Sequence, residues 1–354
     1  MYRILAINPG SSSTKIACYR DEILIFEKNV PFSDQEQAEF KNVIGQLDRR
    51  FEQIKEALME SGEEEKFDAV AARGGLLSPM ESGTYNVNEE MKEYLIKAAR
   101  GEHASNLGAF LAERFAVESS CPAFIVDPVA VDEMSDVARI SGAPEIERSS
   151  LVHALNQKAV ARKVAAKIGK KYCDSRFVVA HLGTGITIGA HLYGRIVDVI
   201  GAKADGPFSP ERAGGLPADM LTDLCCSGKY SCDELKKKLL SGWGLVAYLG
   251  TRDIREAFKM AENDTQAKIV TEAMAYQIAK GVGELAAALD GDLDAVILTG
   301  GLAYSEPLMQ MVEKKIKFLG RIEIIPGEDE LEALALGALR VLRREEPAKE
   351  YVPC

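Results

Sequence analysis

Small and hydroxyl-bearing residues cluster at one turn near the start of the chain, in Asn8-Pro9-Gly10-Ser11-Ser12-Ser13-Thr14-Lys15. Backbone N–H groups in a turn of small residues can approach an anion closely. Four side chains add donors or a cation: Asn8, Ser11, Ser13 and Lys15. Hydroxyls beside a charged ammonium group suit phosphate oxygens, so this segment predicts a phosphate-binding turn.

Two more glycine-rich turns follow apolar runs, Gly183-Thr184-Gly185 after residues 177–182 and Gly300-Gly301 after residues 293–298. None of the three turns matches the P-loop pattern G-x-x-x-x-G-K-[ST]. A dinucleotide fingerprint needs a helix after its glycines, but the alternating, β-branched residues 186–192 predict a strand. The turns therefore favour nucleotide phosphates held by strand–turn–strand hairpins.

The elements that position these turns are mostly strands. Residues 3–8, 14–19 and 22–28 predict three consecutive strands, and residues 178–197 repeat the pattern of residues 4–24. This weak internal similarity suggests two related halves that face a shared cleft. Further strands are predicted over 67–72, 123–128 and 321–325, and helices over 35–60, 88–100, 105–119, 151–169 and 330–343.

Composition limits the function classes. The chain has 354 residues, which suggests two domains, and its formal charge of −11 disfavours a nucleic-acid partner. No run approaches the roughly 18 apolar residues of a membrane span, and the N-terminus does not resemble a secretory signal. The seven cysteines are an odd number at irregular spacing, which indicates free thiols in a reducing cytoplasm rather than a zinc site. We therefore expect a cytoplasmic protein.

Taken together, the motifs resemble the acetate and sugar kinase, Hsp70 and actin superfamily, and within it the short-chain carboxylate kinases of the acetokinase family, with the butyrate kinases as the most similar branch. The segments that carry the resemblance, in chain order, are Asn8–Lys15, Ala71–Ser78, Glu102–Asn106, Phe124–Pro128, His153, His181–Gly189, Arg212–Gly215, Asp253–Arg255, Thr299–Ser305 and Pro326–Leu334. They span nearly the whole chain.

The resemblance implies an α/β fold of two ribonuclease H-like domains around a central cleft. Residues 1–130 with 331–354 would form the N-terminal domain on the carboxylate side, closed by the C-terminal helix. Residues 131–330 would form the C-terminal domain on the nucleotide side. A homodimer or higher homo-oligomer is also implied.

The resemblance also assigns roles to individual residues. It implies that Arg73 binds the substrate carboxylate together with His103, and that Asp127 steers the acid or a water. His153, His181 and Arg212 would act on the transferring phosphoryl group, since a planar guanidinium suits its oxygens. The nucleotide would contact Asn8, Ser11, Ser13, Lys15, Gly183, Thr184, Gly185, Asp253, Arg255, Gly300 and Gly301.

Mg²⁺ is expected with ATP, because it prefers oxygen ligands and one or two protein carboxylates. Glu330 best matches the family's metal-linked acid, with Asn8 beside it and Glu328 and Asp329 as competitors. Acids at a helix start also interact favourably with the helix dipole, so a purely structural interpretation stays open for all three.

The implied reaction is butanoate + ATP = butanoyl phosphate + ADP. Arg73 precedes Gly74-Gly75 where acetate kinases carry His, and Thr184 stands where they carry Asn, which favours the butyrate branch. Acetate, propionate or a branched acid stays an alternative acceptor, because each methylene adds only about 1 kcal/mol of selectivity. An ATP-binding module of the Hsp70 or actin kind, without catalysis, is the alternative of another class.

Overall fold

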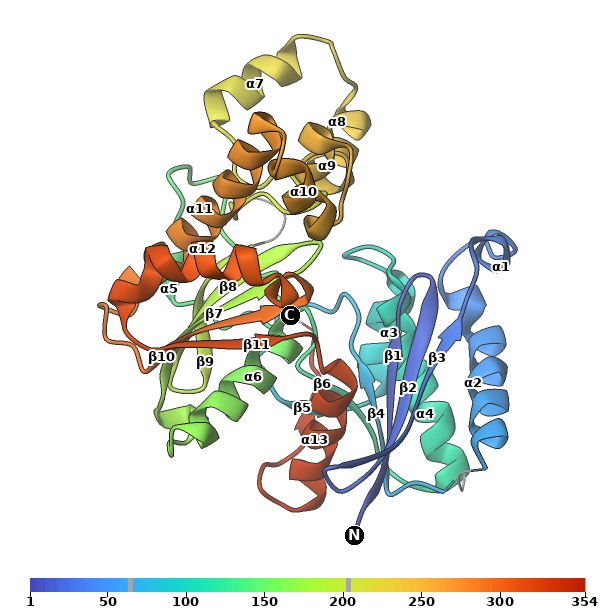
Figure 1. Ribbon diagram of the computed structural model, residues 1–354. Coiled ribbons are helices and arrows are strands. Elements are labelled where there is room, and N and C mark those ends of the chain that lie inside the picture. Colours follow the sequence, from blue (N-terminus) through green and yellow to red (C-terminus); the bar gives the residue numbers. More distant parts are fainter. Residues whose placement is uncertain (63–65, 202–204, 354) are drawn as a thin grey trace. The chain divides into compact units, whose positions relative to one another are not determined.

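The computed structural model describes residues 1–62, 66–201 and 205–353, and these fall into two compact units (Figure 1). Unit 1 comprises Met1–Asp132 and Asp329–Cys354, and unit 2 comprises Glu133–Glu328. Each unit is built on one mixed β-sheet with helices on both faces, so the α/β class expected from the resemblance is confirmed.

The sheet of unit 1 has seven strands in the order β12-β5-β6-β4-β1-β2-β3. Its first three strands form an antiparallel meander, whereas β4 and β6 continue parallel to β1. The strands are β1 (Arg3–Pro9), β2 (Ser13–Arg20), β3 (Ile23–Pro31), β4 (Ala69–Arg73), β5 (Thr84–Asn86), β6 (Ala123–Val126) and β12 (Lys349–Glu350).

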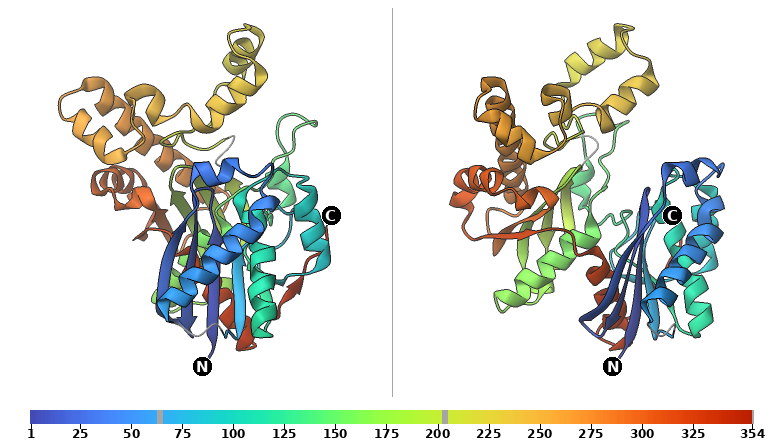
Figure 2. Two further views of the ribbon diagram at one scale, coloured as in Figure 1. Left: turned by 90° about the vertical axis from the view of Figure 1, so that its right-hand side faces the viewer. Right: turned by 45° about the vertical axis from the view of Figure 1, so that its right-hand side comes forward.

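Helices α2 (Leu47–Ser61) and α4 (Gly108–Ser119) cover one face of this sheet, and α13 (Glu330–Leu342) covers the other (Figure 2). Alternate β1 residues such as Leu5 and Ile7 pack in the same buried cluster as the α2 and α4 side chains, as the two-residue period of a strand requires. Helix α3 (Glu89–Lys97) begins where the Asn88 side chain accepts from the Met91 N–H. A 3₁₀ helix, Ala104–Leu107, precedes α4.

The continuous helix expected over residues 35–60 is divided in the structure. Helix α1 (Asp34–Ala38) ends early, and a 3₁₀ turn (Ile44–Gln46) leads into α2. Between them the Asn42 side chain accepts a hydrogen bond from the Gly45 N–H at 3.0 Å. Such a local side-chain bond competes with the helical hydrogen-bond pattern, and the apolar period of the sequence does not reveal it.

The sheet of unit 2 has five strands in the order β11-β10-β7-β8-β9. Strands β7, β8 and β9 form an antiparallel meander, and β10 and β11 continue parallel to β7. The strands are β7 (Arg176–Leu182), β8 (Ile186–Leu192), β9 (Arg195–Ile200), β10 (Ala295–Gly300) and β11 (Ile322–Pro326). Unit 2 thus repeats the meander of unit 1.

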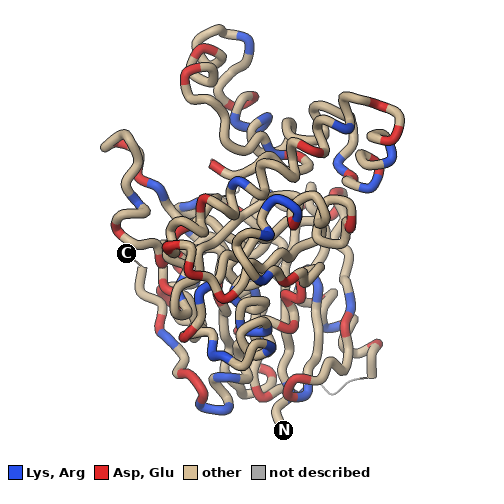
Figure 3. The backbone as a smooth tube through the Cα atoms, turned by 60° about the vertical axis from the view of Figure 1, so that its left-hand side comes forward, with Lys and Arg blue, Asp and Glu red and all other residues tan. Residues whose placement is uncertain are grey.

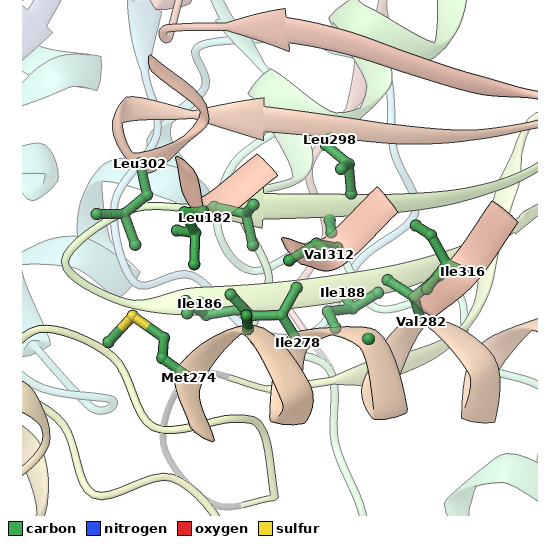
Figure 4. Close-up of a cluster of buried hydrophobic side chains, with 14 of the residues drawn as sticks. Leu182, Ile186, Ile188, Met274, Ile278, Val282, Leu298, Leu302, Val312 and Ile316 are labelled. Carbon is green, nitrogen blue, oxygen red and sulfur yellow. The ribbon is translucent and has the colours of Figure 1, made fainter. Parts of the chain in front are cut away.

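Two helical layers cover the sheet of unit 2. Helix α6 (Ala154–Lys167) packs on one face, against Phe177, Val179 and Ile297. On the other face, Ile186 and Ile188 of β8 pack with Ile278 and Val282 of α11 (Thr265–Ala287), as Figure 4 shows. Helix α12 (Glu306–Ile316) packs beside α11. The α6 face of the meander also holds polar side chains, among them Thr187 and His191.

Shorter helices complete unit 2: α5 (Asp136–Arg139), α7 (Ala218–Cys226), α8 (Cys232–Ser241), α9 (Leu245–Leu249) and α10 (Ile254–Ala261), with 3₁₀ turns at Tyr172–Asp174, Gly301–Tyr304 and Lys317–Leu319. Basic and acidic residues are interspersed along both units (Figure 3). The six described cysteines are free thiols, and Cys354 lies outside the described residues. Within the part of the chain that the structure describes, every helix is too short or too polar to cross a bilayer.

Candidate active site

The first glycine-rich turn joins β1 to β2 in unit 1. The Gly10 N–H donates to the Ser13 carbonyl at 2.8 Å, which closes the turn. Ser11 and Lys15 are exposed, and Ser13 is half-buried. Lys15 forms no ion pair with any described residue, so its ammonium group stays available to an incoming anion.

Arg50 of α2 lies directly behind this turn and was missed by the sequence analysis. Its guanidinium donates to the Ser11 carbonyl at 3.1 Å and to Thr14 Oγ1 at 2.9 Å, and it stacks 4.0 Å from the Phe32 ring centroid. Only 1% of Arg50 is exposed, and burial lowers its pKa to about 10. Among the described residues no carboxylate lies within ion-pair distance of it. The turn therefore rests on a buried positive charge.

Asn8, Arg73 and Glu330 come together in unit 1 although they are far apart in the sequence. Glu330, the first residue of α13, accepts from Asn8 Nδ2 at 2.5 Å and from Arg73 Nη1 at 3.0 Å, both on Oε2. Asn8 and Glu330 are both buried. We call this trio the carboxylate cluster.

The carboxylate cluster also fits the expected Mg²⁺. Asn8 Oδ1 is buried and has no hydrogen-bond partner, which is costly unless a cation or water satisfies it. A buried amide oxygen beside a carboxylate is a donor set that Mg²⁺ accepts, with waters and substrate phosphates completing its shell. The described residues contain no group of three His, Cys, Asp or Glu side chains arranged around a metal. Asn8 and Glu330 therefore fit a site that the substrate must complete.

Asp127 and His103 are held by local contacts in unit 1. Asp127 Oδ1 accepts from the Gly83 N–H at 2.8 Å, and its backbone has a φ of 38°. A non-glycine residue in that region stores strain, which accumulates at functional sites. His103 is exposed and begins the 3₁₀ helix before α4, where its Nδ1 accepts from the Ser105 N–H at 3.2 Å.

The two histidines of unit 2 that the resemblance singles out are stacked on each other. The ring centroids of His153 and His181 are 3.9 Å apart with an interplanar angle of 15°. His153 precedes α6, and its Nδ1 lies 2.9 Å from Thr187 Oγ1. His181 is buried near the end of β7, with Nδ1 at 3.0 Å from Asn156 Oδ1 and Nε2 at 3.1 Å from Glu328 Oε1.

The second turn, Gly183-Thr184-Gly185, is tied to Arg212 through Ser209. Ser209 Oγ donates to the Thr184 carbonyl at 2.5 Å and accepts from the Arg212 N–H at 3.2 Å. Burial lowers the pKa of the Arg212 guanidinium, which nevertheless stays charged at neutral pH. One serine thus links the position of the turn to that of the arginine.

The third turn packs against the second. Gly300 has a φ of 91°, and a Cβ there would lie 2.5 Å from the Leu182 carbonyl oxygen, so only glycine fits. Beside it lies a cavity of about 550 Å³ lined by Arg252, Asp253, Ile254, Arg255, Gly301, Leu302, Tyr304 and Ser305. Bonds to Arg255 lower the pKa of Asp253 to about 2. Three residues expected to contact the nucleotide, Asp253, Arg255 and Gly301, therefore line one cavity of unit 2.

The sequence contained a signal for four further polar residues of unit 2. Asn156 and Gln157 stand three and four places after His153, a spacing that puts them on the same face of a helix. Thr187 and His191 occupy the same face of β8, because alternate residues of a strand point the same way. In contrast, the sequence held no sign that Arg50 would be buried.

Comparisons with known proteins agree with this architecture. The model of the Acetokinase family matches residues 147–333, more than half of the chain. The structure is similar to a propionate kinase from Francisella tularensis subsp. tularensis SCHU S4, with a TM-score of 0.75, 20% identity and coverage of 95% of this chain and 99% of that one.

Two acetate kinases are similar in the same way. For the Porphyromonas gingivalis protein the TM-score is 0.78 at 18% identity, covering 97% of this chain and 100% of that one. For the Entamoeba histolytica protein the TM-score is 0.76 at 16% identity, covering 95% and 98% respectively. These structural similarities show the fold, and the match to the family model shows the family. The chain belongs to the acetokinase family, whose members are phosphotransferases with a carboxyl group as acceptor.

Proposed function

We propose that the chain is a butyrate kinase that transfers the γ-phosphoryl group of ATP to butanoate. A butanoate oxygen forms the new bond to the γ-phosphorus while the bond to the β,γ-bridging oxygen breaks and ADP leaves. With both substrates ionised, no proton is taken up or released. The protein must therefore supply positive charge and alignment rather than acid–base chemistry.

The observation that carries this proposal is the position of Arg73. It ends β4 with its side chain 26% exposed, and Glu330 is its only hydrogen-bond or ion-pair partner among the described residues. One edge of its guanidinium fork therefore stays available, and that geometry suits the two oxygens of a carboxylate. In the proposal Arg73 binds the acid with His103, and Asp127 steers the acid or a water.

Asn8 and Glu330 would hold Mg²⁺ in this proposal. The orphaned Asn8 Oδ1 supports the assignment, and Glu330 is favoured over Glu328 because Glu328 Oε1 already contacts His181. When bound, Mg²⁺ offsets negative charge on the β- and γ-phosphates. Ser11, Ser13 and Lys15 of the first turn contribute hydroxyls and an ammonium group for phosphate oxygens.

Residues of unit 2 would orient the nucleotide and stabilise the transferring group. Arg212, His153 and His181 supply donors for the phosphoryl oxygens, and the glycines at 183, 185, 300 and 301 let backbone approach the nucleotide. Thr184 lies in the second turn, between Gly183 and Gly185. Asp253 and Arg255 line the cavity expected for ribose and adenine.

Butanoate is proposed over other acids because of two sequence features, Arg73 before the Gly74-Gly75 pair and Thr184 in the second turn. Acetate, propanoate and branched acids are the alternatives. The test is acyl phosphate formation, trapped as the hydroxamate, with acetate, propanoate, butanoate, isobutanoate and pentanoate. We expect the highest kcat/KM with butanoate. A maximum with another acid would overturn the butanoate assignment alone.

The same assay separates the proposal from an ATP-binding module without catalysis. ATP binding with no acyl phosphate from any acid would contradict the kinase and favour the module. A homodimer, implied by the resemblance, completes the proposal, and sedimentation of the purified chain measures it directly.

A further inference from the structure

A buried polar layer lies between α6 and β8 in unit 2. Ile186 and Ile188 of β8 belong to the apolar core beneath α11. Thr187 and His191, on the opposite face of the strand, form hydrogen bonds with the Gln157 side chain of α6. Gly189 lies between them, and a Cβ there would come 2.5 Å from Gln157 Oε1. The glycine therefore makes room for Gln157. This residue is the centre of a hydrogen-bonded relay that runs from His191 through Gln157 and Thr187 to His153.

The orientation of the Gln157 amide is fixed by a backbone carbonyl. Gln157 Nε2 lies 3.2 Å from the Thr187 carbonyl oxygen, which can only accept. The amide nitrogen must therefore face Thr187, and it also donates to Thr187 Oγ1 at 3.0 Å. Its oxygen consequently faces His191 Nε2, at 3.0 Å.

This orientation determines the tautomer of His191. Because Gln157 Oε1 accepts, His191 Nε2 must carry the hydrogen, and Nδ1 then accepts from the Tyr172 hydroxyl at 2.8 Å. His191 is fully buried, and burial lowers its pKa to about 3, which agrees with a neutral ring. The far end of the relay is thus neutral and directional.

The near end of the relay is the Thr187 hydroxyl. Its oxygen accepts from Gln157 Nε2 and, at 3.5 Å, from the His153 N–H, which engages both lone pairs. The hydroxyl hydrogen is then directed to His153 Nδ1, 2.9 Å away. His153 Nδ1 must be unprotonated to accept it, so the neutral ring carries its hydrogen on Nε2.

His181, stacked on His153, has the opposite character. Its two nitrogens face the Asn156 amide oxygen and the Glu328 carboxylate, so both can carry hydrogen. The stacked pair therefore combines a ring whose two nitrogens both face acceptors with a ring whose Nδ1 faces a hydroxyl.

We infer that Thr187 is a positioning residue which, oriented by Gln157 and His191, holds His153 in the tautomer with hydrogen on Nε2. This inference rests on the proposed function in one respect, the catalytic role of the tautomer. In that role the Nε2–H group donates a hydrogen bond to a phosphoryl oxygen. The relay itself is a property of unit 2.

The test is ¹⁵N NMR of the four histidine side chains at neutral pH, with His153→Gln to assign the resonances. In the wild type, His153 should show an unprotonated Nδ1 and a protonated Nε2. Thr187→Val keeps the shape and removes the hydroxyl, so it should give a mixture of tautomers. Thr187→Ser keeps the hydroxyl and should restore the wild-type pattern. His103 in unit 1 is the internal reference.

Kinetics supply the second readout. Thr187→Val should lower kcat by about tenfold with little change in the KM of ATP, while Thr187→Ser stays near wild type. Hydrogen on Nδ1 of His153 in the wild type would overturn the inference, as would an unchanged pattern in Thr187→Val. The wild-type spectrum decides even if the valine variant does not fold. If no acyl phosphate forms, the proposed function fails while the NMR result still stands.

Discussion

The two meanders of the molecule share one design. In unit 1 the β1–β2 hairpin closes at the pair Pro9 and Thr14, and in unit 2 the β7–β8 hairpin closes at Leu182 and Ile186. Each second strand then has a register shift against the third, after Cys18 and after Ala190. Both shifts come four residues beyond the closing pair, so the hairpins correspond position by position.

What lies behind the two turns differs. The first turn rests on the buried guanidinium of Arg50, which occupies turn carbonyls with a full positive charge. The second turn is held by the Ser209 hydroxyl, and its strands are backed by the neutral relay through Gln157. The matched strand positions differ accordingly. Ala17 of β2 corresponds to Gly189 of β8, and only a glycine at position 189 leaves room for the Gln157 side chain. One fold thus supports a glycine-rich turn either by charge or by oriented neutral dipoles.

The largest expected effect lies in unit 2. Arg212→Ala should lower kcat on the order of 10³-fold, because an arginine that stabilises a transferring phosphoryl group contributes that much. Steady-state kinetics with ATP and butanoate measure it. Arg195→Ala removes an exposed arginine at the start of β9 and serves as the control. Equal activity of both variants would remove Arg212 from the site.

Arg73→Ala tests whether unit 1 holds the acid. Loss of a charge-assisted bond of about 1.5–3 kcal/mol should raise the KM for butanoate roughly 10- to 100-fold and that for ATP much less. Arg114→Ala, on the surface of α4, removes a partly exposed arginine paired with Asp48 and should leave both constants unchanged. If both KM values rise together, Arg73 does not discriminate the acid from the nucleotide.

Arg50→Met tests the charge behind the first turn directly. Unsatisfied turn acceptors should reduce the stability of unit 1 by about 2–3 kcal/mol, and loss of the charge should weaken ADP binding about tenfold. Calorimetry at low and high salt should show a smaller salt dependence than in the wild type. Arg49→Met, one residue earlier and exposed, is the matched control. Unchanged ADP affinity in a folded Arg50→Met would contradict the electrostatic account.

Exchanging the matched small residues compares the packing behind the two hairpins. Gly189→Ala should displace Gln157 and destabilise unit 2 by about 1–3 kcal/mol. Ala17→Gly, the reciprocal change in unit 1, should cost only about 1 kcal/mol, as expected for glycine within a strand. Chemical denaturation of both variants measures the difference, and equal losses would show that the correspondence carries no packing consequence.

The remaining expected effect is the dependence of stability on pH. His191 has a folded-state pKa of about 3 against an ordinary value of 6.5, so the unfolded state binds the extra proton between these values. The stability of unit 2 should therefore be full above pH 6.5 and fall by up to about 1.4 kcal/mol per pH unit below it. Trp243, the only tryptophan, reports this by fluorescence-detected denaturation at pH 7, 6 and 5. His191→Phe should show a shallower pH dependence, and an equal slope would contradict the assignment.

Local patterns predicted most of the elements that carry the hairpins. The apolar run before Gly183 became β7, and the β-branched alternation after it became β8, which is the observation that excluded a dinucleotide site. The helix expected over 330–343 is α13, Glu330–Leu342. These succeeded because period and turn chemistry act over a few residues.

Long-range contacts could not be predicted from residue patterns. Nothing near Arg50 in the sequence indicates that its charge is buried behind the first turn. Its hydrogen-bond partner there, Thr14, lies 36 residues earlier in the chain. The bond of Asn8 to Glu330 joins residues 322 positions apart and depends on α13 packing against β1. The resemblance proposed both as metal residues, but their mutual contact follows only from tertiary packing.

The most direct test of the account follows one oxygen atom. The enzyme is given Mg-ATP and butanoate labelled with ¹⁸O in both carboxylate positions, and the butanoyl phosphate is examined by ³¹P NMR. Direct attack by the acid predicts a phosphorus bonded to a single ¹⁸O, in the bridge to the acyl group. Acyl phosphate with only ¹⁶O on phosphorus, or no acyl phosphate at all, would contradict the account.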